Sequence, residues 1–218
     1  SVLASKLNSG ALSSNKIKEF ILDVYHKCDH IEEDLIDDLV FFKDHDPACK
    51  YFSTPILFYK GFQGLATYRA AHCLWNDNRH TMALFFQNRA SEIFGVDIHP
   101  AAKISGGVMI DHATGVVIGE TSDIADNVTI YHMVTLGGIS PSINSNDQRE
   151  IKRHPTLHDN VVVGSGAQIL GPVVVGKNAR IGANAVVTKN VPENAVMVGI
   201  PAKNVGTATE EFKPYAVT

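Results

Sequence analysis

An aliphatic residue recurs at almost every sixth position from Ile98 to Val187, and this period is the strongest constraint on the fold. Small or turn-forming residues fill the steps between. Helices repeat at about 3.6 residues and simple strands at about 2, so neither produces this period. A six-residue repeat with one buried aliphatic side chain is typical of a parallel β-helix, in which three repeats close one triangular coil. The repeated positions are Ile98, Ile104, Ile110, Ile118, Ile124, Ile130, Leu136, Leu157, Val163, Ile169, Val175, Ile181 and Val187.

The first 95 residues follow helical spacing instead. Ser13 or Ser14 is available as the N-cap of the first helix, and Gly95 ends the last. The apolar faces of four predicted helices lie within 17–24, 31–40, 65–75 and 82–93. The middle of this region is expected to be broken up by Pro55, Gly61 and Gly64.

The predicted fold class is therefore α+β, with two domains that meet near Gly95–Asp97. An α-helical domain spans 1–95, a left-handed parallel β-helix spans 96–205, and a C-terminal tail spans 206–218. Since the terminal coil of a solenoid must be covered to remain soluble, we expect the helices to cap one end of the β-helix.

Two irregularities interrupt the repeat, and histidines and carboxylates gather beside them. The step from Ile110 to Ile118 is eight residues, and an extruded polar loop near 137–156 abandons the period. Long loops of this kind are usually functional or disordered. A neutral imidazole is the usual base for a hydroxyl proton near neutral pH, and a carboxylate on its far nitrogen fixes its tautomer. The candidate side chains are Asp97, His99, Asp111, His112, His132, His154 and His158.

Composition excludes several classes of protein. A net charge of −4 over 218 residues provides no basic surface for nucleic acid. No apolar run is long enough to span a membrane, and the start lacks a signal-peptide pattern. The three cysteines, Cys28, Cys49 and Cys73, have no metal-like spacing. We expect buried free thiols, a reducing compartment and a cytoplasmic location.

Several segments carry motifs more specific than the six-residue repeat. They are His-Asp-Pro-Ala (45–48), Tyr-Phe-Ser-Thr-Pro-Ile-Leu-Phe-Tyr-Lys-Gly-Phe (51–62), Gly-Val-Asp-Ile-His-Pro-Ala-Ala-Lys-Ile (95–104), Ile-Asp-His-Ala-Thr-Gly-Val-Val-Ile-Gly-Glu-Thr (110–121), Val-Thr-Leu-Gly-Gly (134–138) and Arg-His-Pro (153–155). Together they resemble the serine O-acetyltransferase family of hexapeptide-repeat acyltransferases, from about Asp44 to Gly206.

This resemblance implies transfer of an acetyl group from acetyl-CoA to the hydroxyl of L-serine. The products are O-acetyl-L-serine and CoA, in cysteine biosynthesis, with L-cysteine as the expected feedback inhibitor and no metal. By position, His112 matches the general base and Asp97 its dyad partner. The match also implies that the serine ammonium and carboxylate are held by Asp46 and Asp111, and by Arg153 and His154, respectively.

The resemblance further implies that acetyl-CoA lies in a groove between adjacent β-helices of a homotrimer. Its expected contacts are Gly138, Ser165 and Ala183, where small residues let the backbone approach the pantetheine arm. A backbone amide near Gly137–Gly138 is the expected donor to the oxyanion. The nucleotide phosphates would meet Lys177, Arg180, Lys189 and Lys203, although each of these also fits a solvated turn charge.

Two assembly questions stay open. In many relatives the helical domain joins two trimers, but here that domain is shorter, so both a trimer and a dimer of trimers are compatible with the sequence. Relatives that bind O-acetylserine sulfhydrylase usually end in isoleucine. This chain ends Ala-Val-Thr and so does not predict that partner.

Three other functions compete. The same β-helix could acetylate a sugar or xenobiotic hydroxyl, but Asp46 and Arg153 suit a zwitterionic amino acid better. A trimeric zinc site would use His112, His132 and His154, because catalytic zinc needs three protein ligands and an open position. A purely structural solenoid would leave the charged motifs without a purpose.

Overall fold

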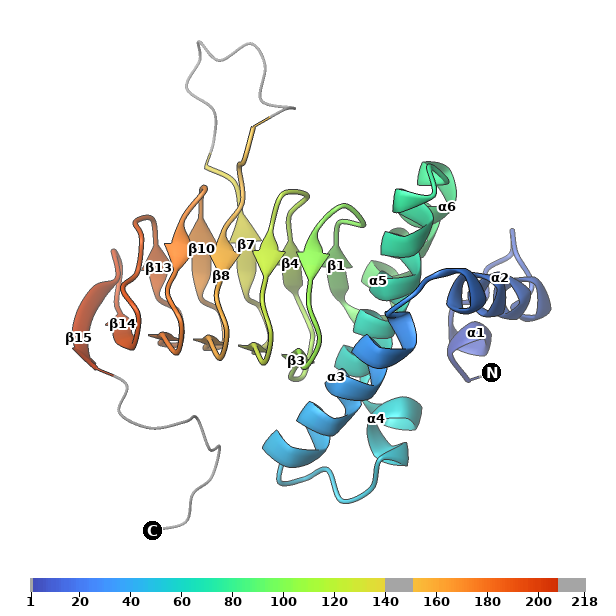
Figure 1. The fold of residues 1–218 in the computed structure, drawn as a ribbon, viewed down its shortest axis with the longest axis horizontal. Coiled ribbons are helices and arrows are strands. Elements are labelled where there is room, and N and C mark those ends of the chain that lie inside the picture. Colours follow the sequence, from blue (N-terminus) through green and yellow to red (C-terminus); the bar gives the residue numbers. More distant parts are fainter. Residues whose placement is uncertain (1, 140–150, 208–218) are drawn as a thin grey trace.

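The computed structural model describes residues 2–139 and 151–207, and it places a group of helices before a three-sided column of short strands (Figure 1). The helices are α1 (Val2–Lys6), α2 (Ser14–Lys27), α3 (Ile31–His45), α4 (Ser53–Phe58), α5 (Lys60–Asn76) and α6 (His80–Phe94). The predicted fold class, a helical region followed by a parallel β-helix, is confirmed. The predicted N-cap, Ser13, caps α2, and Gly95 ends α6 in the left-handed conformation.

The strands take turns among three sheets, each named here by its first strand. The β1 sheet has the order β1-β4-β7-β10-β13, the β2 sheet β11-β8-β5-β2, and the β3 sheet β15-β14-β12-β9-β6-β3. Among these strands all pairings are parallel except that of β14 with β15, which extends to Thr207, two residues beyond the expected end of the β-helix. The bounds are β1 (Val96–Ile98), β2 (Lys103–Ile104), β3 (Met109–Ile110), β4 (Val116–Ile118), β5 (Asp123–Ile124), β6 (Thr129–Ile130), β7 (Thr135–Gly137), β8 (Thr156–Leu157), β9 (Val162–Val163), β10 (Gln168–Leu170), β11 (Val174–Val175), β12 (Arg180–Ile181), β13 (Val186–Val187), β14 (Ala195–Val198) and β15 (Lys203–Thr207).

The repeated aliphatic residues stack inside this column, as the period predicts. In the β1 sheet, Ile118 pairs with Ile98 on one side and with Leu136 on the other. All thirteen repeated positions are at most 9% exposed. Burying one such side chain stabilises the fold by roughly 1.5–3 kcal/mol, so this stack supplies much of the favourable energy of the β-helix. The predicted polar loop leaves the column between β7 and β8, and its residues 140–150 lie outside the described residues.

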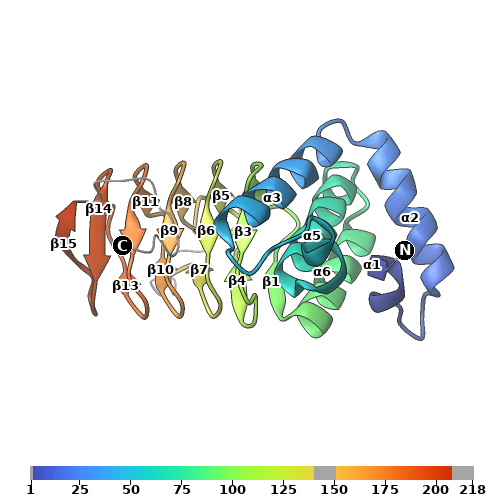
Figure 2. The ribbon, with the colours of Figure 1, turned by 90° about the horizontal axis from the view of Figure 1, so that it is seen from below.

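The helical domain covers one end of the β-helix (Figure 2), as expected from the need to close the first coil. The prediction that Gly61 and Gly64 break the helical pattern is wrong, because both lie inside α5. A Cβ at Gly61 would stand 1.8 Å from the Ile110 carbonyl oxygen, and one at Gly64 would stand 3.1 Å from Val96. These glycines let α5 lie directly on the first coil.

Pro55 likewise does not interrupt a helix. It is the third residue of α4, in the first turn, where a backbone N–H has no intrahelical partner and its loss costs little.

A buried ion pair joins the helices to the first coil. Arg69 of α5 donates from Nε to Asp38 Oδ2 of α3 (2.7 Å) and from a second nitrogen to Asp38 Oδ1 (2.8 Å). The same guanidinium reaches the Ser105 carbonyl (2.8 Å), while the Val108 N–H donates to Asp38 (2.9 Å). Removing one partner of a buried pair typically costs about 3–5 kcal/mol. This pair therefore fixes how the cap sits on the β-helix.

The cysteines differ from the prediction of three free thiols. Cys28, at the end of α2, is paired in a disulfide with Cys73 of α5, and their Cα atoms are 6.4 Å apart. Cys49 is free and buried. The sequence missed the pair because its partners are 45 residues apart and meet only when α2 packs on α5. The Cys28–Cys73 disulfide gives no support to the predicted reducing compartment.

Candidate active site

The first part of the site is a cleft of about 600 Å³ between the helical domain and the first coil. We call Asp46, Asp111 and His112, which line it, the His112 cluster. Asp46 ends α3, while Asp111 and His112 follow β3 in the eight-residue step. This step is two residues longer than the repeat, so the chain bulges here, and His112 and Ala113 within it have positive φ angles of 58° and 59°.

The His112 imidazole is accessible from this cleft. Its side chain is 73% exposed, and its Nε2 lies 3.5 Å from Asp111 Oδ2. Burial raises the pKa of Asp111 above its ordinary value, and the neighbouring His112 opposes that rise. An accessible imidazole beside carboxylates can accept a proton from a bound hydroxyl.

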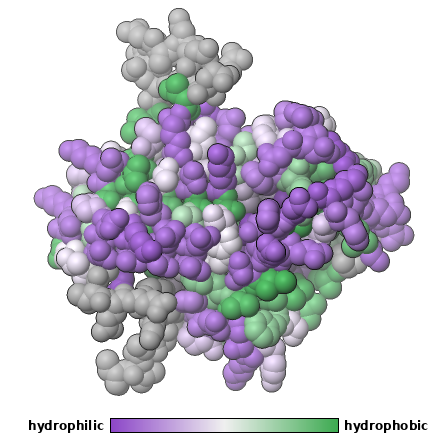
Figure 3. Space-filling model, in the orientation of Figure 1, coloured by the Kyte–Doolittle hydropathy of each residue, from purple (hydrophilic) through white to green (hydrophobic). Residues whose placement is uncertain are grey.

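Tyr59 and Lys60 also line the cleft, and neither was a predicted site residue. Burial and a hydrogen bond with Asp46 raise the pKa of Tyr59 to about 12, so its hydroxyl stays protonated at neutral pH. Lys60 Nζ donates to Thr114 Oγ1 across the bulge. Both residues belong to the 51–62 motif, which was the available signal. Phe58, at the wall of this cleft, is 73% exposed. Figure 3 shows that most of the visible surface is hydrophilic, with a hydrophobic patch below its middle.

The second part of the site lies where β4 ends and where the chain returns before β8. We call Arg153 and His154, with Glu120 and Thr121 beneath them, the Arg153 cluster. Arg153 donates to the Glu120 carboxylate. The His154 ring packs on Gly119, where a Cβ would stand 2.0 Å from its Cδ2. Burial and the adjacent Arg153 lower the pKa of His154, which keeps the imidazole neutral near neutral pH.

The two clusters lie at opposite ends of one strand. The His112 bulge leads into β4, and Gly119 follows β4 directly. The path from Gly115 to Gly119 spans about 13 Å at roughly 3.3 Å per residue. One chain therefore brings together Asp46, Asp111 and His112, and separately Arg153 and His154.

The predicted acetyl-CoA contacts are likewise split between the two ends of the strands. Gly138 lies beside the Arg153 cluster, because a Cβ at this glycine would stand 3.7 Å from the Arg153 carbonyl oxygen. Ser165 and Ala183 follow β9 and β12, where the β3 sheet turns into the β1 sheet, as the His112 bulge does. They stack on successive coils, since the Asn184 N–H donates to the Ser165 carbonyl (2.8 Å).

Asp97 lies on β1 and has a partner other than His112 in the chain. Gln87 of α6 donates from Nε2 to Asp97 Oδ1 (2.7 Å). Its neighbours Val96 and Ile98 are buried, so the Asp97 side chain is on the outward face of the strand. The predicted dyad with His112 stays a prediction.

The remaining histidines do not converge on a metal. His132 is 5.8 Å from His112 between ring centroids, but His154 belongs to the cluster at the other end of β4. His99 packs on Trp75, and His158 is exposed. Within residues 2–139 and 151–207, no group of three or more His, Cys, Asp or Glu side chains could hold a metal ion.

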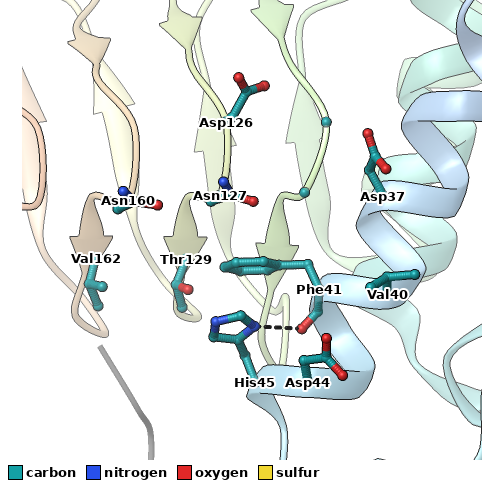
Figure 4. A pocket seen from close by; sticks show the side chains of 12 residues that line it. Asp37, Val40, Phe41, Asp44, His45, Asp126, Asn127, Thr129, Asn160 and Val162 are labelled. Atoms are coloured by element: carbon teal, nitrogen blue, oxygen red, sulfur yellow. Dashed lines mark hydrogen bonds between the residues drawn. The ribbon is translucent and has the colours of Figure 1, made fainter. Parts of the chain in front are cut away.

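A second cleft, of about 490 Å³, lies between α3 and the turns of the β-helix (Figure 4). Asp37 and Asp44 of α3 line one side, and Asp126 and Asn127 line the other. His45 points into it, with its Nδ1 3.0 Å from the Phe41 carbonyl oxygen. It contains none of the predicted site residues, and its acidic lining suits neither a CoA phosphate nor a substrate carboxylate.

Comparison with known proteins gives a match in each domain. The family model "Serine acetyltransferase, N-terminal" matches residues 1–67, and "Bacterial transferase hexapeptide (six repeats)" matches residues 154–189. Serine acetyltransferase of Buchnera aphidicola subsp. Acyrthosiphon pisum is 43% identical over 210 residues, covering 96% of this chain and 74% of that protein.

Solved structures agree with this result. A serine acetyltransferase in complex with cysteine has a TM-score of 0.89 and 44% identity, covering 94% of this chain and 82% of that one. A serine acetyltransferase in complex with CoA has a TM-score of 0.86 at 44% identity, with the same coverage. None of the helices in the described part of the chain has the length and apolar character needed to cross a membrane.

The predicted enzyme class is confirmed by these matches, and the alternative acceptors are not favoured. The helical motifs matter most here, because the six-residue repeat alone is common to many acyltransferases. With relatives above 40% identity over most of both lengths, the chain belongs to the serine acetyltransferase family.

Proposed function

We propose that this chain transfers the acetyl group of acetyl-CoA to the hydroxyl of L-serine, forming O-acetyl-L-serine and CoA. The observation that carries this proposal is the arrangement of the His112 cluster. An accessible imidazole stands beside two carboxylates, Asp46 and Asp111, in a cleft. Carboxylates hold an ammonium group, and the imidazole accepts the proton of a hydroxyl carried by the same small molecule.

In the proposed reaction, His112 takes the proton as the serine oxygen attacks the thioester carbonyl carbon. A carbon–oxygen bond forms, and the tetrahedral intermediate then breaks its carbon–sulfur bond. The His112 imidazolium returns the proton to the leaving CoA sulfur, so the base is regenerated. The negative oxygen of the intermediate needs a donor, for which the backbone near Gly137–Gly138 is proposed. Asp97 is proposed to orient the imidazole.

The substrate carboxylate is proposed to bind Arg153 and His154. Arg153 offers a planar set of donors that matches a carboxylate, and the substrate would compete with Glu120 for it. Competition by L-cysteine at the same position is proposed as feedback inhibition, because cysteine carries the same ammonium and carboxylate groups.

The distance between the clusters supports a homotrimer in which each site is shared. A single amino acid is far shorter than the β4 strand that separates Asp111 from Arg153 in one chain. A second copy that sets its Arg153 cluster against the first copy's His112 cluster would complete the site. The proposed acetyl-CoA contacts fit the same arrangement, because Gly138 lies beside the Arg153 cluster while Ser165 and Ala183 lie at the same corner of the β-helix as His112.

The activity is tested by following CoA release from acetyl-CoA with L-serine, and then with added L-cysteine. Serine-dependent release that cysteine suppresses supports the proposal. Release with a sugar hydroxyl but not with serine would keep the acyltransferase and reject the acceptor. A metal analysis of the active protein tests the zinc alternative.

Shared sites are tested by co-expressing two impaired variants, His112→Ala, which lacks the general base, and Arg153→Ala, which is slow at serine concentrations below its raised KM, and by assaying the mixture at such a low serine concentration. An interface between the two variants contains one intact His112 cluster and one intact Arg153 cluster. Recovery of activity above that of either variant alone supports a shared site. Mixed oligomers that stay inactive would place the whole site within one chain.

A further inference from the structure

Thr121 forms hydrogen bonds with both Arg153 and His154. Its Oγ1 accepts hydrogen bonds from the backbone N–H groups of Arg153 (2.9 Å) and His154 (3.0 Å). Its own N–H donates to His154 Nδ1 (3.1 Å), and its Oγ1 also lies 2.9 Å from that nitrogen. One threonine therefore holds the backbone and the ring of the returning chain.

These contacts decide which ring nitrogen carries the proton. A backbone N–H is only a donor, so the Nδ1 it faces must accept. Because Thr121 Oγ1 already accepts two N–H groups, its hydroxyl hydrogen can point at the same Nδ1. A neutral His154 then carries its hydrogen on Nε2, and a proton on Nδ1 would meet two donors.

The surroundings hold the ring in place on its other side. A Cβ at Gly119 would stand 2.2 Å from His154 Nε2, and one at Gly138 would stand 3.8 Å from it. The Nε2–H therefore lies beside these two glycines. A side chain at position 119 would fill the space that the ring occupies.

We propose that Thr121 is a positioning residue that fixes His154 as the Nε2–H tautomer and presents this hydrogen, together with Arg153, to the carboxylate of the amino-acid acceptor. The site would thus bind the carboxylate with one cationic and one neutral donor. This inference rests on the proposed function for the identity of the ligand. The tautomer itself does not depend on that function.

The kinetic test compares Thr121→Val, which removes the hydroxyl at nearly constant shape, with Thr121→Ser, which keeps it. Loss of the hydroxyl should raise the KM for L-serine roughly ten-fold, the effect of one lost hydrogen bond to the positioned pair. The kcat at saturating serine should change less than about two-fold, since His112 is untouched. Thr121→Ser should restore the wild-type KM. Thr129→Val, on the buried β6 strand, controls for loss of a threonine hydroxyl elsewhere in the β-helix.

The direct test uses ¹⁵N-histidine NMR of the intact protein, with the His154 signals assigned by their loss in His154→Gln. The expected wild-type spectrum shows a protonated Nε2 and an unprotonated Nδ1, and Thr121→Val should mix the tautomers. A wild-type His154 protonated on Nδ1, or an unchanged serine KM in folded Thr121→Val, would overturn the inference. If the wild type releases no CoA with serine, the proposed function fails, while the NMR result still decides the role of Thr121.

Discussion

The two ends of β4 are built in contrasting ways. The His112 cluster stands on the eight-residue bulge, where φ is positive, and its imidazole is 73% exposed. The Arg153 cluster is tied down by several hydrogen bonds to Thr121 and by the packing of His154 on Gly119. A group that accepts and returns a proton needs access to its substrate, whereas a group that binds a carboxylate gains from being held in place. The contrast predicts that loss of the base, His112, lowers kcat, whereas changes to the groups that hold the charges of the amino acid, above all Arg153, raise the KM for serine.

The largest effect is expected from His112→Ala. Loss of a general base typically lowers the rate by about 10²–10⁴-fold, so kcat should fall within this range while the protein stays folded. Steady-state kinetics and circular dichroism measure both. His158→Ala, at an exposed histidine of the same β-helix, should retain normal turnover. A near-normal kcat in folded His112→Ala would contradict the assignment of His112 as the general base.

Arg153→Ala is expected to act at the other end. A hydrogen bond with a charged partner contributes about 1.5–3 kcal/mol, so the KM for serine should rise roughly 10–100-fold with a smaller change in kcat. Arg153→Lys keeps the charge but loses the planar pair of donors, so its KM for serine should lie between those of the wild type and Arg153→Ala. A fall in kcat without any change in KM would contradict the division of roles.

Two glycine variants test the same contrast through packing. Gly119→Ala places a Cβ against the His154 ring and should raise the KM for serine about ten-fold by displacing one donor.

Gly61→Ala places a Cβ against the Ile110 carbonyl, so it should push α5 from the first coil and lower the free energy of unfolding by about 1–3 kcal/mol. Gly10→Ala, in open space, is the control for both. Equal thermal stability of Gly61→Ala and Gly10→Ala would show that the close approach is not needed.

The smallest effect is expected from Tyr59→Phe. Loss of its hydrogen bond to Asp46 should raise the KM for serine about three- to ten-fold. Because the pKa of Tyr59 is about 12, this hydroxyl is neutral in the working range, and its effect should not vary between pH 6 and 9, both of which lie about three or more pH units below that value. Tyr68→Phe, which loses a buried bond to the Ala102 carbonyl, should lower stability instead. A strongly pH-dependent Tyr59→Phe effect would point to another role.

Much of the fold was predictable because the aliphatic side chains that stabilise it recur at a short, regular interval in the sequence. From Ile98 to Val187, each repeated position places one aliphatic side chain inside the column, so each can be recognised from the sequence around it. The glycines of α5 were misread because their purpose is a contact with Ile110, which is remote in sequence. The Cys28–Cys73 pair was missed for the same reason.

The family motifs named the candidate site residues one by one, but not how the structure groups them. The resemblance implied that Asp97 pairs with His112, and in the structure Asp97 accepts a hydrogen bond from Gln87. Thr121 and Tyr59 carried no chemical signal of their own, since a hydroxyl becomes important only through what it touches. Tertiary contacts of this kind cannot be read from a periodic pattern.

The parallel stacking of the coils also separates stability from activity along the molecule. In a solenoid, each coil contacts only its neighbours, so disorder spreads from one coil to the next rather than across the whole domain. Both clusters lie on the coils near the helical cap, and β13 to β15 lie at the far end of the column (Figure 1). Fraying that begins at β15 can therefore unfold the last coils first, including the acetyl-CoA contact proposed at Ala183, while the acid–base chemistry beside β4 is insulated from it by the intervening coils.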